Sequence, residues 1–486
     1  MTADTVTPAA LAPTRGAPGA GQAHRARLVA DVLATLTLAA VAVPLAHAGG
    51  GRDAGQVALV LPLLAAALVA CRVWRVLAWG WLAGAAALAV AALAVLVVGG
   101  RSGAVAAASY GLAAGTGLLV AAWARDATRA GVAAGLVLLS GAVQVGWSLV
   151  PWWGAGDPST PWVGTYYWYN QLAAALLLPA LLGAGVVLSA APRLRLAAWV
   201  LTPLCVAGVV LSTSRASQAA LAVGWVLVAA VALRVAGPGA RRGVGVRAAA
   251  LSGLAAAVTV VLPGPPLFAH RSDPWAGTVA RASSGQSLST NGTFRREFFH
   301  EALHAFATHP LTGAGYGRIA AGQSVPSGWA LSPLAHNTVL QALGEGGLLL
   351  GLPVAVALLA VGAALVGVLG HAVVVPAAWR GSTGRVGVAS LPLFAAVAAL
   401  AVGGHSLVDA DASYPALGAL AAACAGLGMA GLATARPAVL GGRGSDRRLA
   451  LAATVVVVVA LLAGAVLAWG QPFHITAPGL LFGGSA

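Results

Sequence analysis

The stretch "AHNTVLQALGEGGLLLGL", residues 335–352, combines two features that rarely share one helix. Its composition suits a lipid bilayer, yet Asn337, Gln341 and Glu345 recur every four residues and form a polar stripe along a helix. An ionisable side chain in hydrocarbon costs several kcal/mol unless it has a partner. The stripe is therefore expected to face a bundle interior or a wet cavity, with His336 at the mouth of the helix.

The composition of the whole chain indicates a polytopic membrane protein. Of its 486 residues, 59% are hydrophobic and only 8% charged, and the mean hydropathy is +0.88. All 27 basic residues are arginine, which GC-rich codon usage explains. The arginines are scattered among short loops, so the net charge of +15 indicates membrane topology and no nucleic-acid partner. The three cysteines lie in or beside apolar segments and predict neither a disulfide framework nor a thiolate metal site.

The apolar runs predict an all-α polytopic fold with about 12–13 transmembrane helices and one long external loop that contains helices. The expected spans lie at 28–46, 56–71, 77–98, 103–124, 129–150, 170–190, 195–212, 216–235, 248–264, 337–369, 388–408, 413–433 and 449–469. The expected divisions are a basic cytoplasmic tail (1–27), a first bundle of about nine helices (28–264), the external loop (265–335), the C-terminal core helices (336–433), and a final segment with a basic loop, an extra helix and an external tail (434–486).

The positive-inside rule predicts the orientation. With the N-terminus in the cytoplasm, 19 arginines fall in inside loops and 8 in outside loops. The first span also resembles a signal peptide with a cleavage site at 46–48, but Asp31 and the long preceding tail favour a retained helix.

Two external segments have functional content. The loop at 151–169 is crowded with Trp and Tyr, which is typical of an interfacial aromatic belt and also suits a platform for a sugar or a lipid tail. The longer loop contains a predicted amphipathic helix at 293–309, "TFRREFFHEALHAFATHP", which is stopped by Pro310. Its apolar face includes Leu303. Arg295 interrupts that face, so its guanidinium needs an anion or a carboxylate such as Asp409. The opposite face carries Glu and His at metal-ligand spacing, which is weak evidence for a metal.

The same external end gathers further polar residues. Arg215 lies in "LSTSRASQAA" among small hydroxyl side chains, as in a phosphate-binding turn or a plain polar turn between helices. His336 could act as a general base or serve a structural role. The turn "GGHSLVDADASYPALGAL", residues 403–420, adds Asp409 and Asp411 beside His405. No comparable set occurs at the bilayer midplane, where an ion-coupled transporter would need charges.

Five segments occur in an order that resembles the O-antigen ligase and polymerase family of bacterial membrane glycosyltransferases. They are "GTYYWYNQLA", "STSRAS", "TFRREFFHEALHAFATHPLTGAGYG", "AHNTVLQALGEGGLLLG" and "HSLVDADASYPALGAL", spread over roughly residues 160–430. The resemblance implies a GT-C-like fold in the bacterial cytoplasmic membrane. It implies transfer of a glycan from an undecaprenyl-pyrophosphate donor to a glycan or glycolipid acceptor hydroxyl on the external face, by inversion and without metal or other cofactor.

The resemblance also implies roles for individual residues. Arg215 and Arg295 would bind the donor pyrophosphate, and His336 would be the catalytic base. The supporting positions are Asp409, Asp411, Asn337, Glu345 and Asn170, and the motif does not decide which aspartate is functional. The extra thirteenth span departs from the family pattern. The alternatives are a transporter or flippase of lipid-linked or anionic solutes, and an assembly partner without catalysis.

Overall fold

The chain is an all-α polytopic membrane protein, as the apolar runs predict. The computed structural model describes residues 20–45, 54–99, 103–154, 164–166, 169–189, 192–262, 285–316, 319, 321–325, 328–332, 335–380, 388–409, 411, 414–435 and 446–469. One short antiparallel hairpin, β1 (Ala321–Val325) with β2 (Gly328–Ser332), is an unpredicted exception within that part of the chain. The other regular elements described there are helices.

The helices follow the predicted spans closely. They are α1 (Ala20–Ala40), continued by the π-turn η1 (Val41–Leu45), α2 (Ala54–Ala70), α3 (Trp79–Gly99), α4 (Gly103–Trp123), α5 (Ala127–Gly154), α6 (Tyr169–Leu188), α7 (Pro192–Leu211), α8 (Arg215–Val235), α9 (Pro238–Val261), α11 (Gly285–Thr308), α12 (Thr338–Val374), α13 (Leu391–His405), α14 (Pro415–Ala435) and α16 (Asp446–Ala468). Ten helices within the described ranges are long and apolar enough to cross a membrane, and shorter apolar stretches lie in α3, α4 and α13. Helices suit this setting because their backbone hydrogen bonds are satisfied internally.

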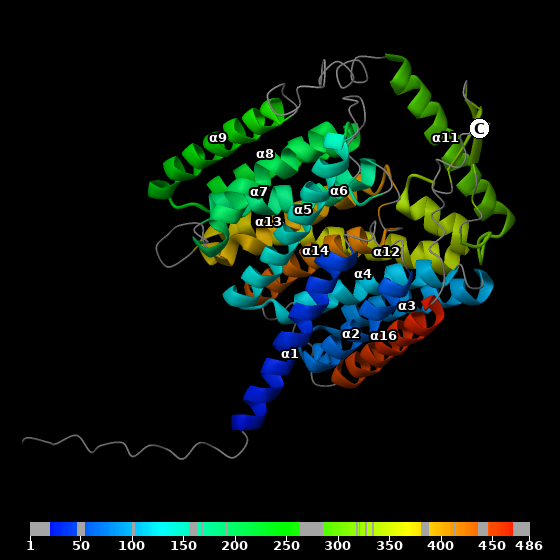
Figure 1. The fold of residues 1–486 in the computed structure, drawn as a ribbon. Coiled ribbons are helices and arrows are strands. Elements are labelled where there is room, and N and C mark those ends of the chain that lie inside the picture. Colours follow the sequence, from blue (N-terminus) through cyan, green and yellow to red (C-terminus); the bar gives the residue numbers. More distant parts are fainter. Residues whose placement is uncertain are drawn as a thin grey trace, which may run out of the picture.

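The bundle is built around four central helices, which are α4, α6, α13 and α14. The residues of α6 are buried from Gln171 to Leu188, and α6 packs against α7, α8 and α13. The helices α4 and α14 pack closely together, and α13 joins α14 to α6. In Figure 1, α2, α3 and α16 lie on one side of this centre, and α7, α8 and α9 lie on the other. The extra helix α16 therefore packs within the bundle, against α2 and α3.

Several boundaries differ from the sequence prediction. Helix α1 begins eight residues earlier than expected, α9 ten residues earlier, and α11 begins at Gly285, because polar residues extend each helix beyond its apolar run. The aromatic loop is shorter than expected, since Pro151 to Gly154 continue α5. The cleavage site at 46–48, loop residues 155–163 and 263–284, and the tail at 470–486 lie outside the described residues.

Helix α12 was expected to be continuous, but it is broken at Gly347, whose φ of 56° and ψ of −151° are not helical. The segment 310–315, directly after α11, lies across the break and pairs with its backbone. The bonds are Leu348 N to Pro310 O (2.8 Å), Leu349 N to Leu311 O (3.1 Å), Ala314 N to Gly344 O (2.8 Å) and Gly315 N to Glu345 O (3.0 Å). We call this contact between 310–315 and 344–349 the α12 crossing. It satisfies the backbone groups that the break exposes and fastens α11 to α12.

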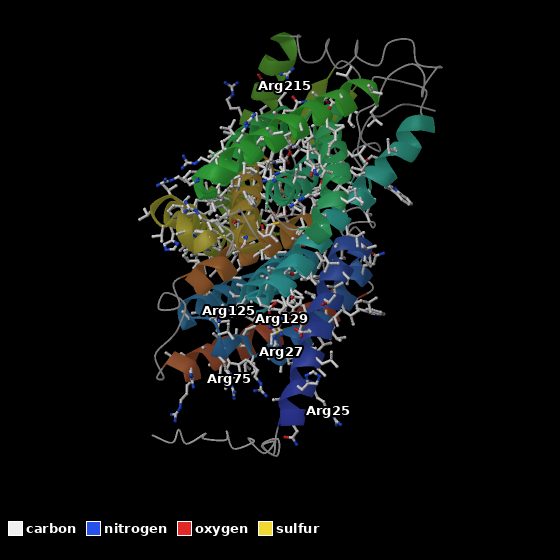
Figure 2. The ribbon with its side chains drawn as sticks, turned by 90° about the vertical axis from the view of Figure 1, so that its left-hand side faces the viewer. Arg25, Arg27, Arg75, Arg125, Arg129 and Arg215 are labelled. Atoms are coloured by element: carbon white, nitrogen blue, oxygen red, sulfur yellow. The ribbon has the colours of Figure 1, made fainter. Side chains whose placement is uncertain are left out.

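At the end of the bundle where α1 begins, ion pairs and one hydrogen bond join α1, α4 and α5. Arg129 of α5 pairs with Asp31 of α1 at 2.7 Å, and Trp123 of α4 donates to the same carboxylate at 2.8 Å. Arg27 lies 3.8 Å from Asp126. Figure 2 shows arginines gathered in this region, whereas Arg215 lies far from them at the start of α8. Asp31 thus belongs to a network that anchors α1 to the bundle.

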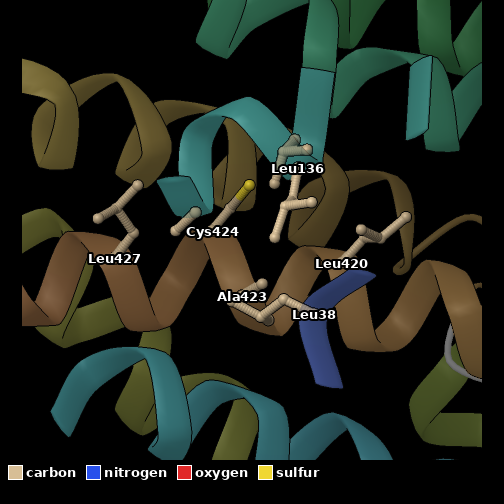
Figure 3. A pocket seen from close by; sticks show the side chains of 8 residues that line it. Leu38, Leu136, Leu420, Ala423, Cys424 and Leu427 are labelled. Atoms are coloured by element: carbon tan, nitrogen blue, oxygen red, sulfur yellow. The ribbon is translucent and has the colours of Figure 1, made fainter. Parts of the chain in front are cut away.

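A small apolar pocket lies between α1, α5 and α14 (Figure 3). Its lining is Leu38, Ala133, Leu136, Val137, Leu420, Ala423, Cys424 and Leu427. Apart from the Cys424 thiol these side chains are aliphatic, so the pocket offers no charged group that could bind a phosphate. The polar residues singled out by the sequence lie elsewhere.

Candidate active site

The start of α12 meets the turn between α13 and α14, and Asn337 holds the two together. Its side-chain oxygen caps α12 by accepting from the backbone N–H of Val339 and Leu340, both at 2.9 Å. Its side-chain nitrogen donates to Leu407 O at 2.8 Å. The backbone N–H of Thr338 also donates to Ser406 O at 2.9 Å. The turn that carries both aspartates is therefore bonded to the residues that follow His336.

The imidazole ring of His336 has one partner at a ring nitrogen and another against its face. Its Nδ1 lies 3.2 Å from Asp409 Oδ1, and its ring stacks on Phe298 of α11 at a centroid distance of 5.1 Å. The His336 side chain is 17% exposed, whereas that of Asp409 is 1% exposed. The imidazole is therefore oriented by a buried carboxylate and still reaches the surface. That arrangement fits a general base with an orienting acid.

Asp409 has a second partner, Gln171 of α6, whose Nε2 donates to the same Oδ1 at 2.9 Å. The sequence reasoning singled out Asn170, which is half-buried one residue earlier, and missed Gln171. The only signal for it in the sequence is an amide at the start of an otherwise apolar run. Gln171 ties the central helix α6 to the His336 pair, so the candidate site is anchored to the core of the bundle.

Asp411 belongs to a different pair. Its Oδ2 lies 2.8 Å from Nδ1 of His405 and accepts from the Ser406 hydroxyl at 3.0 Å. Both side chains of the pair are almost fully buried. Burial raises the pKa of Asp411, and the neighbouring His405 opposes that shift. Burial, with a smaller effect from Asp411, likewise raises the pKa of Tyr166 above its usual range. The two aspartates that the motif left undecided thus have separate partners.

Arg295 lies on α11, which packs against α12. It is half-buried, whereas its neighbour Arg296 is exposed, as the helical pattern predicted. Asp409, named above as one possible carboxylate partner of Arg295, bonds His336 and Gln171 through Oδ1. The charge of Arg295 does act on His405, which places the guanidinium near the turn. The predicted apolar face is too broad at Leu303, which is 49% exposed.

Arg215 is the first residue of α8 and is half-buried. The preceding turn includes Thr213 at a φ of 65°, and the hydroxyl of Ser214 donates to that of Ser217 at 3.1 Å. Helix α8 packs against α6 and α13, the helices that carry Gln171 and His405. Arg215 is therefore associated with the candidate site by the packing of its helix, and Arg295 by its electrostatic effect on His405.

The deeper part of the polar stripe is buried, as expected. Gln341 is 0% exposed and Glu345 2%, and the amide of Gln341 donates to the Glu345 carboxylate at 2.7 Å. Gln341 also accepts from the backbone N–H of Ala335. Because Glu345 lies at the α12 crossing, these contacts link the crossing to the residue before His336.

The alternative metal site on α11 is not assembled. His300 and His304 are exposed and lie side by side at a ring-centroid distance of 6.5 Å. Within the described part of the chain, no three His, Cys, Asp or Glu side chains are grouped so that they could hold a metal ion.

Comparison with known protein families bears on the class of the chain. The fold and the polar end define a class: polytopic membrane proteins with a buried His–carboxylate pair at one end of the bundle. Residues 197–355 match the family model described as O-Antigen ligase. The resemblance to the O-antigen ligase and polymerase family is thereby confirmed. The match includes Arg215, Arg295 and His336 and ends before Asp409. No curated protein matches the chain.

Proposed function

We propose that the protein is a glycosyltransferase that moves a glycan from undecaprenyl pyrophosphate to an acceptor hydroxyl on the external face of the bacterial cytoplasmic membrane. The observation that carries the proposal is the hydrogen bond between partly exposed His336 and buried Asp409, at the start of a helix within the O-antigen ligase match. Arg295 supplies positive charge that acts on the neighbouring His405. These groups supply a base and an anion-binding charge, which such a transfer needs.

His336 acts as the base in this mechanism. Because Nδ1 faces Asp409, Nε2 is the nitrogen that takes the proton of the acceptor hydroxyl. The hydroxyl oxygen forms a bond to the anomeric carbon, while the bond from that carbon to the pyrophosphate oxygen breaks. Asp409 fixes the ring and stabilises the imidazolium that forms, and the new linkage has inverted configuration.

The two arginines act on the leaving group. Arg295 and Arg215 bind the pyrophosphate and offset the charge it gains as its bond to the sugar breaks. A guanidinium suits this role because it keeps its charge and presents several donors to phosphate oxygens. Pyrophosphate is already a good leaving group, so the mechanism needs no metal.

The experiment combines purified protein in lipid nanodiscs with a defined polyprenyl-diphosphate glycan and candidate acceptors, and identifies products by mass spectrometry. His336→Ala is expected to lower transfer by at least about a hundredfold, since general base catalysis contributes 10²–10⁴-fold. Arg295→Ala and Arg215→Ala are expected to weaken donor binding and turnover together. The matched controls are Arg296→Ala and His300→Ala, which change exposed residues of α11 and should leave transfer unchanged.

Two results would contradict the proposal. One is full transfer by folded His336→Ala. The other is movement of the lipid-linked donor across proteoliposome membranes without a new glycosidic bond, which would indicate a transporter.

A further inference from the structure

The turn between α13 and α14 carries two carboxylates, and each of them pairs with a histidine. Only one of these histidines is the proposed base. His336 pairs with Asp409, and His405 pairs with Asp411 at a shorter distance of 2.8 Å. The second pair is almost fully buried, at 1% and 2% side-chain exposure, so it cannot contact a bound substrate in this conformation. A buried ionisable pair is costly to form. Its presence beside the candidate site therefore requires a reason.

The second pair closes the turn that carries Asp409. His405 is the last residue of α13 and Asp411 lies six residues later, and their side chains bond across the segment between them. Within the turn, the N–H groups of Val408 and Asp409 donate to His405 O at 2.8 and 2.9 Å. The Ser406 hydroxyl donates to Asp411 and the Ser406 carbonyl accepts from Thr338 N. The place of Asp409 thus depends on a backbone loop that the His405–Asp411 contact holds shut.

The charges around His405 also favour a role for the His405–Asp411 pair in holding the turn that carries Asp409. Asp411 and Asp409 face it from the turn, Arg295 acts on it from α11, and Asp409 also acts on Asp411. Two buried carboxylates only two residues apart repel each other, and a protonated His405 bonded to Asp411 reduces that repulsion. His336 before α12, Tyr166 before α6 and Arg215 on α8 are further titratable or charged groups on neighbouring elements.

We propose that His405 and Asp411 are positioning residues that hold Asp409, and through it the ring of His336, without touching the substrate. This inference rests on the proposed function, because it assigns the pair to the base of that reaction. A positioned base acts in the transition state, so loss of the pair lowers kcat and leaves the donor KM nearly unchanged.

The test compares three variants with a control. His405→Leu removes the donor to Asp411, His405→Asn keeps a donor near the position of Nδ1, and Asp411→Asn keeps the shape of the carboxylate without its charge. His371→Leu is the control, because His371 is also buried on a membrane helix and bonded, to Trp379 at 3.2 Å, but lies near the other end of α12. The measurements are kcat and donor KM, together with backbone hydrogen exchange of residues 405–411.

The expected result is a fall in kcat of about tenfold or more for His405→Leu, smaller than the full contribution of a general base. His405→Asn should recover most of that loss, and Asp411→Asn should fall between the two. Hydrogen exchange at 405–411 should speed up in His405→Leu, return towards the wild-type rate in His405→Asn, and stay unchanged in His371→Leu.

Hydrogen exchange separates failure of this inference from failure of the proposed function. If wild-type protein transfers glycan but folded His405→Leu keeps both its kcat and its exchange rates, the positioning role is wrong and the function stands. If only the donor KM rises, the pair acts on donor binding and the inference is again overturned. If wild-type protein has no transferase activity but exchange responds as expected, the pair still holds the turn, and the reaction assigned to the site is wrong.

Discussion

His336 has an unusual backbone for its residue type, with a φ of 51° in the left-handed region. That region costs a residue with a Cβ roughly 1–2 kcal/mol. The surrounding contacts maintain it, since Asn337 caps the helix and Phe298 stacks on the ring. Strain of this kind is common where a side chain must be aimed. The backbone of His336 therefore supports a role for its side chain.

Replacement of His336 should separate stability from activity. His336→Gly is expected to be more stable than His336→Ala by about 1 kcal/mol, because glycine adopts positive φ without the Cβ penalty. Neither variant should transfer glycan, since both lack the imidazole. Unfolding in mixed micelles measures the first expectation and product analysis the second. Equal stability of the two variants would show that the left-handed backbone is not strained.

Asn337 should be a structural residue, and two substitutions divide its roles. Asn337→Ala loses the helix cap and the bond to Leu407 O, and should destabilise the protein by roughly 1–2 kcal/mol. Asn337→Asp keeps the cap acceptor and loses only the donor, so it should be the less destabilised variant. Unfolding measurements on the pair decide this, and the reverse order would assign the main contribution to the Leu407 bond.

The sequence identified the residue types of the site but not their pairing. His336, Asp409 and Asp411 were visible as polar residues at span ends, because charge is rare in this chain. Which aspartate faces His336 depends on how the nine-residue turn between α13 and α14 folds against another helix, and no periodicity encodes that. Gln171 was missed for a related reason, since an uncharged amide stands out little beside Asn170.

At the scale of elements, the α12 crossing fixes how α11 lies on α12. Helix α11 carries Arg295 and Phe298, and α12 begins just after His336. Four backbone hydrogen bonds join the segment after α11 to the break in α12. The spans themselves were predictable from hydropathy, but the break was not, because Gly347 lies within an unbroken apolar run. The hairpin β1–β2 was likewise hidden within the long polar loop.

Substitution at the crossing should affect both stability and catalysis. Gly313 has a φ of 66°, and a Cβ there would overlap the backbone of Glu345 and Gly346. Gly313→Ala is therefore expected to destabilise the protein by several kcal/mol or to separate the two segments, with a clear loss of transfer. The matched control is Gly362→Ala on α12, where a Cβ would meet nothing within 4 Å. Unchanged stability and transfer in Gly313→Ala would show that the crossing does not hold α11.

At the scale of the whole molecule, the two ends of the bundle differ in chemistry. One end has arginines at the start of α1 and after α4, with Arg129 and Asp31 paired between helices. The other end has the two His–carboxylate pairs, capped by α11. The positive-inside rule predicts that the first end faces the cytoplasm. The proposed donor and acceptor meet outside, so the function requires the second end to face the exterior.

Cysteine labelling tests this orientation directly. In a Cys71→Ala background, in which the remaining Cys205 and Cys424 are buried, single cysteines replace exposed residues at each end. His300→Cys, an exposed position of α11 two residues after the Phe298 that stacks on His336, should react with a membrane-impermeant maleimide on intact spheroplasts. Arg125→Cys, between α4 and α5, should react only after permeabilisation. The parent Cys71→Ala protein controls for labelling of the native cysteines. The opposite pattern would put His336 on the cytoplasmic side, where the external transfer proposed for this site could not occur.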